Sequence, residues 1–123
     1  MSMKILIVDD EAEVLRFLLL RLEKSGYSVR VAMDGETAVD LAKKDQPDLI
    51  FLDINLPNID GYEVASQIRN EPLLKQTKII FATADSRVRN KSDLPEFHAD
   101  DYLIKPFTAD EMFNMLEKHI RIH

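Results

Sequence analysis

Short, continuous apolar runs recur along this chain, and stretches with helical patterning separate them. The strongest runs cover residues 5–8, 49–52 and 79–82, and a weaker run covers residues 102–104. Runs that are apolar throughout and rich in β-branched and aromatic side chains are typical of parallel strands buried on both faces. Residues 28–32 instead alternate polar and apolar side chains, which indicates an edge strand with one wetter face. The alternation of strand and helix patterns restricts the chain to a fold built on a mostly parallel sheet.

Helical patterns fill the intervals between the runs. They are the stripe of Leu15, Leu18, Leu19 and Leu22 followed by a C-cap signal at Gly26, residues 36–44 before Pro47, residues 62–70 before Pro72, and a last helix from the capping box Thr108-Ala109-Asp110-Glu111 through Ile120. Right-handed crossovers between parallel strands place such helices on both faces of the sheet. We therefore expect one α/β domain that fills residues 1–123.

Composition excludes several other classes of protein. The chain has 16 Lys and Arg against 22 Asp and Glu, a formal net charge of −6, and no Cys. Without Cys, disulfide scaffolds, thiolate zinc sites and thiol nucleophiles are impossible. An acidic chain lacks the basic face on which most nucleic-acid binding depends, and the first apolar run is too short for a signal peptide or a membrane span. We expect a compact, cytoplasmic domain that contacts neither nucleic acid nor a membrane.

Polar and charged side chains follow each central strand of the predicted sheet. These residues are Asp9 and Asp10 after the first strand, Asp53 and Asn55 after the third, Thr83 after the fourth and Lys105 after the fifth. In open α/β sheets, chemistry gathers at the carboxyl ends of the strands, near the point where the strand order reverses. We therefore expect three carboxylates, a hydroxyl and an ammonium group to converge on one edge of the sheet.

Such a cluster predicts metal-assisted phosphoryl chemistry. Three neighbouring carboxylates repel one another, so one takes a proton or a cation neutralises them. Mg²⁺ favours this kind of oxygen site, where it binds one or two carboxylates together with water and phosphate oxygens. Next to such a metal, Asp53 could attack a phosphoryl group in line and form an acyl phosphate. Lys105 would pair with the phosphoryl oxygens, and Thr83 would donate a hydrogen bond to another.

Five motifs along the chain, taken together, carry a family resemblance. They are Ile-Val-Asp-Asp at 7–10, Leu-Asp-Ile-Asn-Leu-Pro at 52–57, Asp-Gly at 60–61, Ala-Thr-Ala at 82–84 and Ala-Asp-Asp-Tyr-Leu-Ile-Lys-Pro-Phe at 99–107. In this order and spacing the chain resembles the receiver domain of two-component response regulators, in the single-domain form typified by the chemotaxis regulator. The resemblance implies a flavodoxin-like, doubly wound, five-stranded parallel sheet of order 2-1-3-4-5, and a phosphorylation-dependent signalling switch. From the length we expect one receiver domain and no attached output domain within residues 1–123.

The resemblance also implies roles for the residues at the predicted edge. Asp53 matches the phosphoacceptor, Asp10 the direct metal ligand, Asp9 the ligand that acts mostly through water, and Asn55 the position whose backbone carbonyl binds the metal. Thr83 and Tyr102 match the switch pair, Lys105 matches the active-site lysine, and the following bond to Pro106 is usually cis. The metal would be Mg²⁺, with Mn²⁺ as a substitute. The domain would catalyse its own phosphorylation and dephosphorylation and would not be a metabolic enzyme.

The expected phosphodonor is a phosphohistidine on a sensor histidine kinase or a histidine phosphotransfer protein. Phe17 and Leu20 lie opposite the core stripe of the first helix, because each helical residue turns about 100°. We expect this face, with Val14 and Pro106, to dock the donor. The output partner is not identified, and the chain could be a monomer or a phosphorylation-dependent dimer.

One segment departs from the family pattern. Residues 86–98 contain Pro95, which cannot lie deep in a helix, and His98, which replaces an expected glycine. We expect a short, irregular or mobile fourth helix with a basic surface, and we expect Asp85 to act on the lifetime of the phosphoryl group. The three histidines, His98, His119 and His123, are far apart in sequence, and we interpret them as solvated surface residues.

Three alternative functions share parts of this pattern. A phosphatase or mutase with an aspartyl nucleophile typically has a second acid two residues later, where this chain has Asn55. A pseudo-receiver that only binds partners would lack a site residue, whereas each one is present. An FMN-binding flavodoxin needs a hydroxyl- and glycine-rich phosphate loop after the first strand, where Asp9 and Asp10 would repel phosphate.

Overall fold

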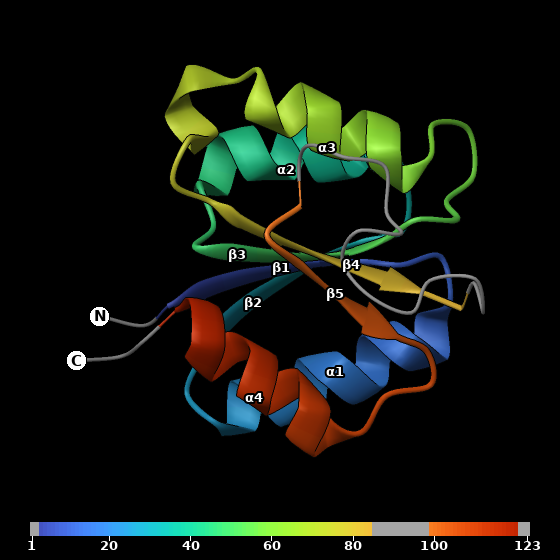
Figure 1. Ribbon diagram of the computed structural model, residues 1–123, viewed down its shortest axis with the longest axis vertical. Helices are drawn as coiled ribbons and strands as arrows, with labels where there is room; N and C mark the ends of the chain where they lie inside the picture. Colours follow the sequence, from blue (N-terminus) through green and yellow to red (C-terminus); the bar gives the residue numbers. More distant parts are fainter. Residues whose placement is uncertain (1–2, 85–98, 121–123) are drawn as a thin grey trace.

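Parallel strands in the order β2-β1-β3-β4-β5 form the central sheet of the computed structural model, which describes residues 3–84 and 99–120 (Figure 1). The strands are β1 (Lys4–Val8), β2 (Ser28–Ala32), β3 (Leu49–Asp53), β4 (Lys78–Thr83) and β5 (Asp101–Ile104). The helices are α1 (Ala12–Lys24), α2 (Gly35–Asp45), α3 (Gly61–Arg69) and α4 (Ala109–His119), with a 3₁₀ turn, η1 (Pro72–Leu74). The predicted flavodoxin-like fold and its strand order 2-1-3-4-5 are confirmed.

The helices cover both faces of the sheet. Helices α2 and α3 lie on one face, and α1 and α4 lie on the other (Figure 1). Successive side chains of a strand point to opposite faces. Thus Leu6 and Ile50 pack under α2 and α3, whereas Ile7 and Phe51 pack against α1 and α4. Both faces need apolar side chains, which explains why the central runs are apolar throughout.

Helix ends agree with the local sequence signals. Asp34 and Asp60 cap α2 and α3, and Thr108 with Glu111 forms the predicted capping box of α4. After α1, Ser25 is the C-cap and Gly26 follows it with φ of 95°, a left-handed conformation that suits glycine. None of the helices in the described ranges has the length and apolar content that a membrane crossing requires.

Some local expectations were wrong or remain outside the described residues. Leu19 is only half-buried, so the core stripe of α1 is narrower than predicted, and the 3₁₀ turn was not predicted. The expectations for Asp85, for residues 86–98 and for His123 fall outside the described residues.

His119 is not a solvated surface residue, contrary to the sequence prediction. Its side chain is 13% exposed, and its Nε2 lies 2.9 Å from Oδ2 of Asp101. The last turn of α4 carries His119 to the first residue of β5, although 18 positions separate the two residues in the chain. A buried carboxylate needs polar partners, and His119 is one of them.

Candidate functional site

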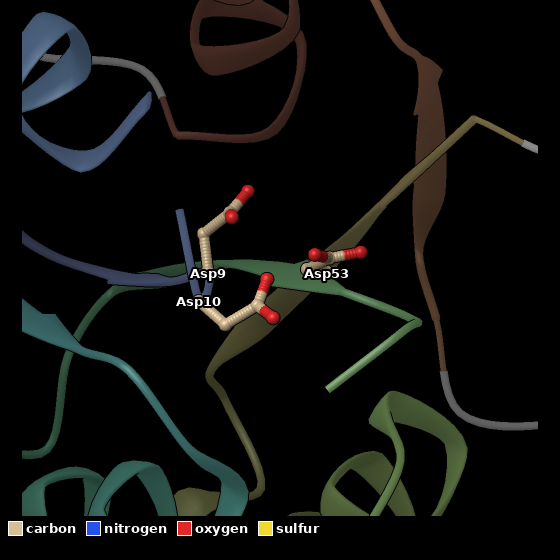
Figure 2. A group of neighbouring side chains, drawn as sticks. All are labelled: Asp9, Asp10 and Asp53. Carbon is tan, nitrogen blue, oxygen red and sulfur yellow. The ribbon is translucent and has the colours of Figure 1, made fainter. Parts of the chain in front are cut away.

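Three carboxylates meet at the carboxyl ends of β1 and β3. Asp9 and Asp10 follow β1, and Asp53 is the last residue of β3 (Figure 2). Each of these side chains offers an oxygen, and these oxygens all lie within 4.8 Å of one another. The sequence prediction that these three residues converge is therefore confirmed by the geometry.

Backbone amides orient two of these carboxylates. The amide N–H of Glu11 donates to Oδ1 of Asp9 over 2.9 Å, and the amide N–H of Asn55 donates to Oδ1 of Asp53 over 3.1 Å. Both donors lie two residues after their acceptor, a local turn that aspartate favours. Asp9 and Asp53 are buried, whereas Asp10 and Asn55 are exposed. The second oxygen, Oδ2, of each buried carboxylate points toward Lys105.

Lys105 joins the two buried carboxylates. Its Nζ lies 2.6 Å from Oδ2 of Asp9, 3.3 Å from Oδ2 of Asp53 and 3.7 Å from Oε1 of Glu11. The lysine follows β5, and its peptide bond to Pro106 is cis, as the family resemblance implies. One ammonium group therefore contacts the carboxylates of Asp9, Asp53 and Glu11, and Asp10 adds a further negative charge beside Asp9 and Asp53. The cluster keeps an excess negative charge that a cation can neutralise.

The pKa values of Asp53 and Lys105 are both raised, but for different reasons. Burial raises the pKa of the Asp53 carboxyl, and the charge of Asp9 adds to this effect, against lowering by the Asn55 amide and by Lys105. Burial alone would lower the pKa of Lys105, but its hydrogen bond to Asp9 and the charges of Asp53 and Asp9 outweigh burial and raise that pKa. Both shifts favour the protonated forms, so Lys105 keeps its positive charge and the Asp53 carboxylate is more basic than that of an exposed aspartate.

The donor set fits a hard divalent cation. Carboxylate oxygens from Asp9, Asp10 and Asp53 can face one small volume, and Mg²⁺ favours oxygen ligands, of which one or two are typically carboxylates. The exposed position of Asp10 leaves solvent access, which such a metal needs in order to retain water. These three residues could hold the metal, and Asn55 lies beside them through its hydrogen bond to Asp53.

Thr83 and Tyr102, the predicted switch pair, lie on neighbouring strands. Thr83 ends β4 and is 1% exposed, and its backbone carbonyl accepts a 2.7 Å hydrogen bond from the amide of Lys105. Tyr102 lies on β5 opposite Phe81 in the strand register, and its half-buried ring packs against the core beneath α2 and α3. The two residues are thus connected to the cluster through adjoining strands.

The predicted docking residues divide into two groups. Val14, Phe17 and Pro106 line one groove of about 440 Å³, which Lys105 also reaches. Leu20 is 60% exposed but is not among the residues that line this groove. Phe17 is 40% exposed, and the guanidinium carbon of Arg21 lies 4.7 Å from the centre of its ring. The groove therefore opens beside the carboxylate cluster, on the α1 side of the site.

Sequence reasoning missed two residues of this region. Glu11 directly follows the Asp9-Asp10 pair, and its carboxylate reaches Lys105, a contact that its place before α1 could have indicated. Gly61 belongs to a recognised motif, but no sequence pattern indicates that a side chain at this position would clash with the backbone of Asp53 and Ile54.

Comparisons with known proteins identify the family of this chain. The family model described as response regulator receiver domain matches residues 5–117. The chain is 44% identical over 112 residues to the alkaline phosphatase synthesis transcriptional regulatory protein PhoP of Bacillus subtilis, and this match covers 91% of the chain and 46% of that protein. The chain thus spans about half the length of the curated relatives it matches.

Solved structures show the same likeness. One is the response regulator TrrA of Thermotoga maritima in complex with Mg²⁺–BeF, with a TM-score of 0.85, 38% identity, and coverage of 97% of this chain and 100% of that one. Another is the chemotaxis protein CheY4 of Vibrio cholerae, with a TM-score of 0.89, 28% identity, and coverage of 98% and 100%. With its fold, its carboxylate cluster and these matches, the chain belongs to the response regulator receiver domains, the phosphorylation-dependent switches of two-component signalling.

Proposed function

We propose that this domain accepts a phosphoryl group on Asp53 from a phosphohistidine and thereby switches its binding to an output partner. The observation that carries this proposal is the cluster itself, in which oxygens of Asp9, Asp10 and Asp53 lie within 4.8 Å and Lys105 bridges two of them. Asp9, Asp10 and Asp53, with the backbone carbonyl of Asn55, would hold Mg²⁺, and Mn²⁺ would substitute for it. A bound cation supplies positive charge that lowers the repulsion between Asp53 and an incoming phosphoryl group.

In the proposed step, a carboxylate oxygen of Asp53 attacks phosphorus in line. The new O–P bond forms as the N–P bond to the donor histidine breaks, and the bonding electron pair stays on the imidazole nitrogen. The ammonium group of Lys105 lies 3.3 Å from the reacting carboxylate, and it forms an ion pair with the oxygens of the transferred phosphoryl group. The Thr83 hydroxyl donates a hydrogen bond to another of these oxygens.

The switch would follow from these new contacts. A phosphoryl group that binds Thr83 favours one arrangement of the end of β4, and Tyr102 on β5 responds by turning inward. The differential contacts with the phosphoryl group set how far the population shifts between the two conformations. Proximity of the two strands, whose pairing includes Phe81 with Tyr102 and Thr83 with Ile104, supports this coupling.

The groove beside α1 supports a docking site for the phosphodonor. Val14, Phe17 and Pro106 offer an apolar surface next to the reacting carboxylate, and Leu20 extends the exposed face of α1. The donor would be a sensor histidine kinase or a histidine phosphotransfer protein in the cytoplasm. Residues 1–123 would act as one receiver domain, as a monomer or as a phosphorylation-dependent dimer, with no direct contact to nucleic acid or membrane.

Intact-mass spectrometry tests the central step. The chain is incubated with Mg²⁺ and phosphoramidate, and we expect a labile mass gain of one phosphoryl group that is lost in Asp53→Asn and after metal chelation. Asp40→Asn, on the exposed side of α2, is the matched control and should be phosphorylated like the parent. A folded parent chain that gains no mass would favour a binding module without phosphoryl chemistry.

A further inference from the structure

The first residue of α3 lies close to the backbone of Asp53, the proposed phosphoacceptor, and of Ile54. Gly61, the first residue of α3, is buried, and its amide N–H donates to the carbonyl of Ile54 over 2.8 Å. A Cβ atom on Gly61 would lie 2.5 Å from the backbone oxygen of Asp53, 2.7 Å from Cα of Ile54 and 3.1 Å from the carbonyl carbon of Asp53. These are all backbone atoms, which cannot rotate away as a side chain can.

Gly35 offers an internal comparison in the same local setting. Both glycines are buried, both begin a helix, and both follow an aspartate whose side chain accepts a hydrogen bond from a backbone amide, Asp34 before Gly35 and Asp60 before Gly61. A Cβ on Gly35 would meet Ile59 Cγ1 at 2.5 Å and Val64 Cγ2 at 2.6 Å. These are side-chain atoms of Ile59 and Val64, so the clash at Gly35 falls on side chains and not on the backbone of Asp53 and Ile54.

The phosphoacceptor carboxylate depends on the backbone that Gly61 touches. Asp53 ends β3, and its Oδ1 accepts from the amide of Asn55, so a displaced backbone at residues 53–54 moves both ends of this hydrogen bond. With alanine at position 61, the distance from its Cβ to the backbone oxygen of Asp53 must grow from 2.5 Å to at least 3.0 Å to relieve the clash. Displacements approaching 1 Å can cost about 100-fold in a reaction that depends on in-line positioning.

We propose that Gly61 is a positioning residue for the reaction at Asp53: its missing side chain lets α3 hold the Asp53–Ile54 backbone where the carboxylate meets Asp9 and Asp10. This inference rests on the proposed function, because it assigns a role in the same phosphoryl site. Gly61 has no positive φ, so an alanine there is excluded by the close backbone contact and not by its own backbone conformation.

The test compares Gly61→Ala with Gly35→Ala in the whole chain. Urea denaturation measures stability, titration calorimetry measures Mg²⁺ affinity, and intact mass measures the phosphorylation rate with phosphoramidate at saturating Mg²⁺. Under conditions in which both variants are folded, we expect Gly61→Ala to weaken Mg²⁺ binding and to slow phosphorylation by about tenfold or more. Gly35→Ala should stay within about twofold of the parent in both measurements, even where it loses as much stability.

Each outcome decides the proposal. Equal losses in the two variants, or none in Gly61→Ala, would overturn it, as would a Gly61→Ala chain that does not fold while Gly35→Ala does, since Gly61 would then serve folding. If the parent chain itself gains no phosphoryl group, the proposed function fails. The Mg²⁺ comparison still decides the positioning role, because it needs no phosphorylation.

Discussion

The buried carboxylate of Asp101 binds the side chains of Lys118 and His119 in α4, and we predict that these contacts stabilise the domain. Asp101 is 7% exposed at the start of β5. Its Oδ2 lies 2.8 Å from Nζ of Lys118 and 2.9 Å from Nε2 of His119, and its Oδ1 accepts from the amide of Tyr102. Burial raises the pKa of this carboxyl, but the hydrogen bonds from Lys118 and His119 outweigh it and lower the pKa from 3.8 to about 2.

The fall in the pKa of Asp101 on folding determines how much this carboxylate stabilises the domain. A fall in pKa from 3.8 to about 2 corresponds to roughly 2.4 kcal/mol of stabilisation at neutral pH, at about 1.36 kcal/mol per pKa unit. The Lys118 side chain is 66% exposed, and solvent screening reduces the figure to about 1.5–2 kcal/mol. Because the folded state holds the depressed pKa, this stabilisation is present above pH 3.8 and is lost as the pH falls toward 2.

The perturbation is Asp101→Asn, and thermal and urea unfolding are measured from pH 7 down to pH 2. At pH 7 we expect the free energy of unfolding to fall by about 1.5–2 kcal/mol and the melting temperature by about 6–8 °C. The gap between variant and parent should narrow as the pH falls below 4 and be nearly closed at pH 2. Asp40→Asn, on the exposed side of α2, is the control and should change little. A gap of the same size at pH 7 and pH 2.5 would refute the reasoning, because packing and not charge would then explain it.

Four further predictions concern the site and the caps. Mg²⁺ at 100 times its dissociation constant should raise the free energy of unfolding by about 2.7 kcal/mol, and chelation or Asp10→Asn should remove the gain, as thermal unfolding can check. Since burial raises the pKa of Asp53, Mg²⁺ affinity measured by calorimetry should begin to fall at a higher pH than an exposed aspartate would allow. Phe17→Glu should slow transfer from a phosphohistidine donor but leave phosphoramidate labelling intact, and equal loss of both would contradict the docking proposal. Thr108→Ala should cost about 1 kcal/mol in urea unfolding, because it removes the cap of α4; a loss below about 0.3 kcal/mol would contradict that role.

The sequence predicted the sheet well because its signals are local. Each central strand is a short apolar run, and the acidic residues at the carboxyl ends of β1 and β3 are the ones that meet in space. His119 was misjudged because its partner, Asp101, depends on how the end of α4 lies over β5. The role of Gly61 could not be predicted, because a glycine alone does not show which backbone lies close to it.

The ion pair between Lys105 and Asp9 joins residues from the two ends of the chain, so it can form only late in synthesis. The two residues are 96 positions apart, and all strand pairings are parallel, so β1 must wait for β3 to emerge before it can pair on that side. During synthesis the acidic residues leave the ribosome first, and the ammonium group that bridges Asp9 and Asp53 comes last. A nascent or truncated chain that stops before Lys105 lacks these ion pairs, so the charge arrangement of the site forms only once nearly the whole domain has been translated.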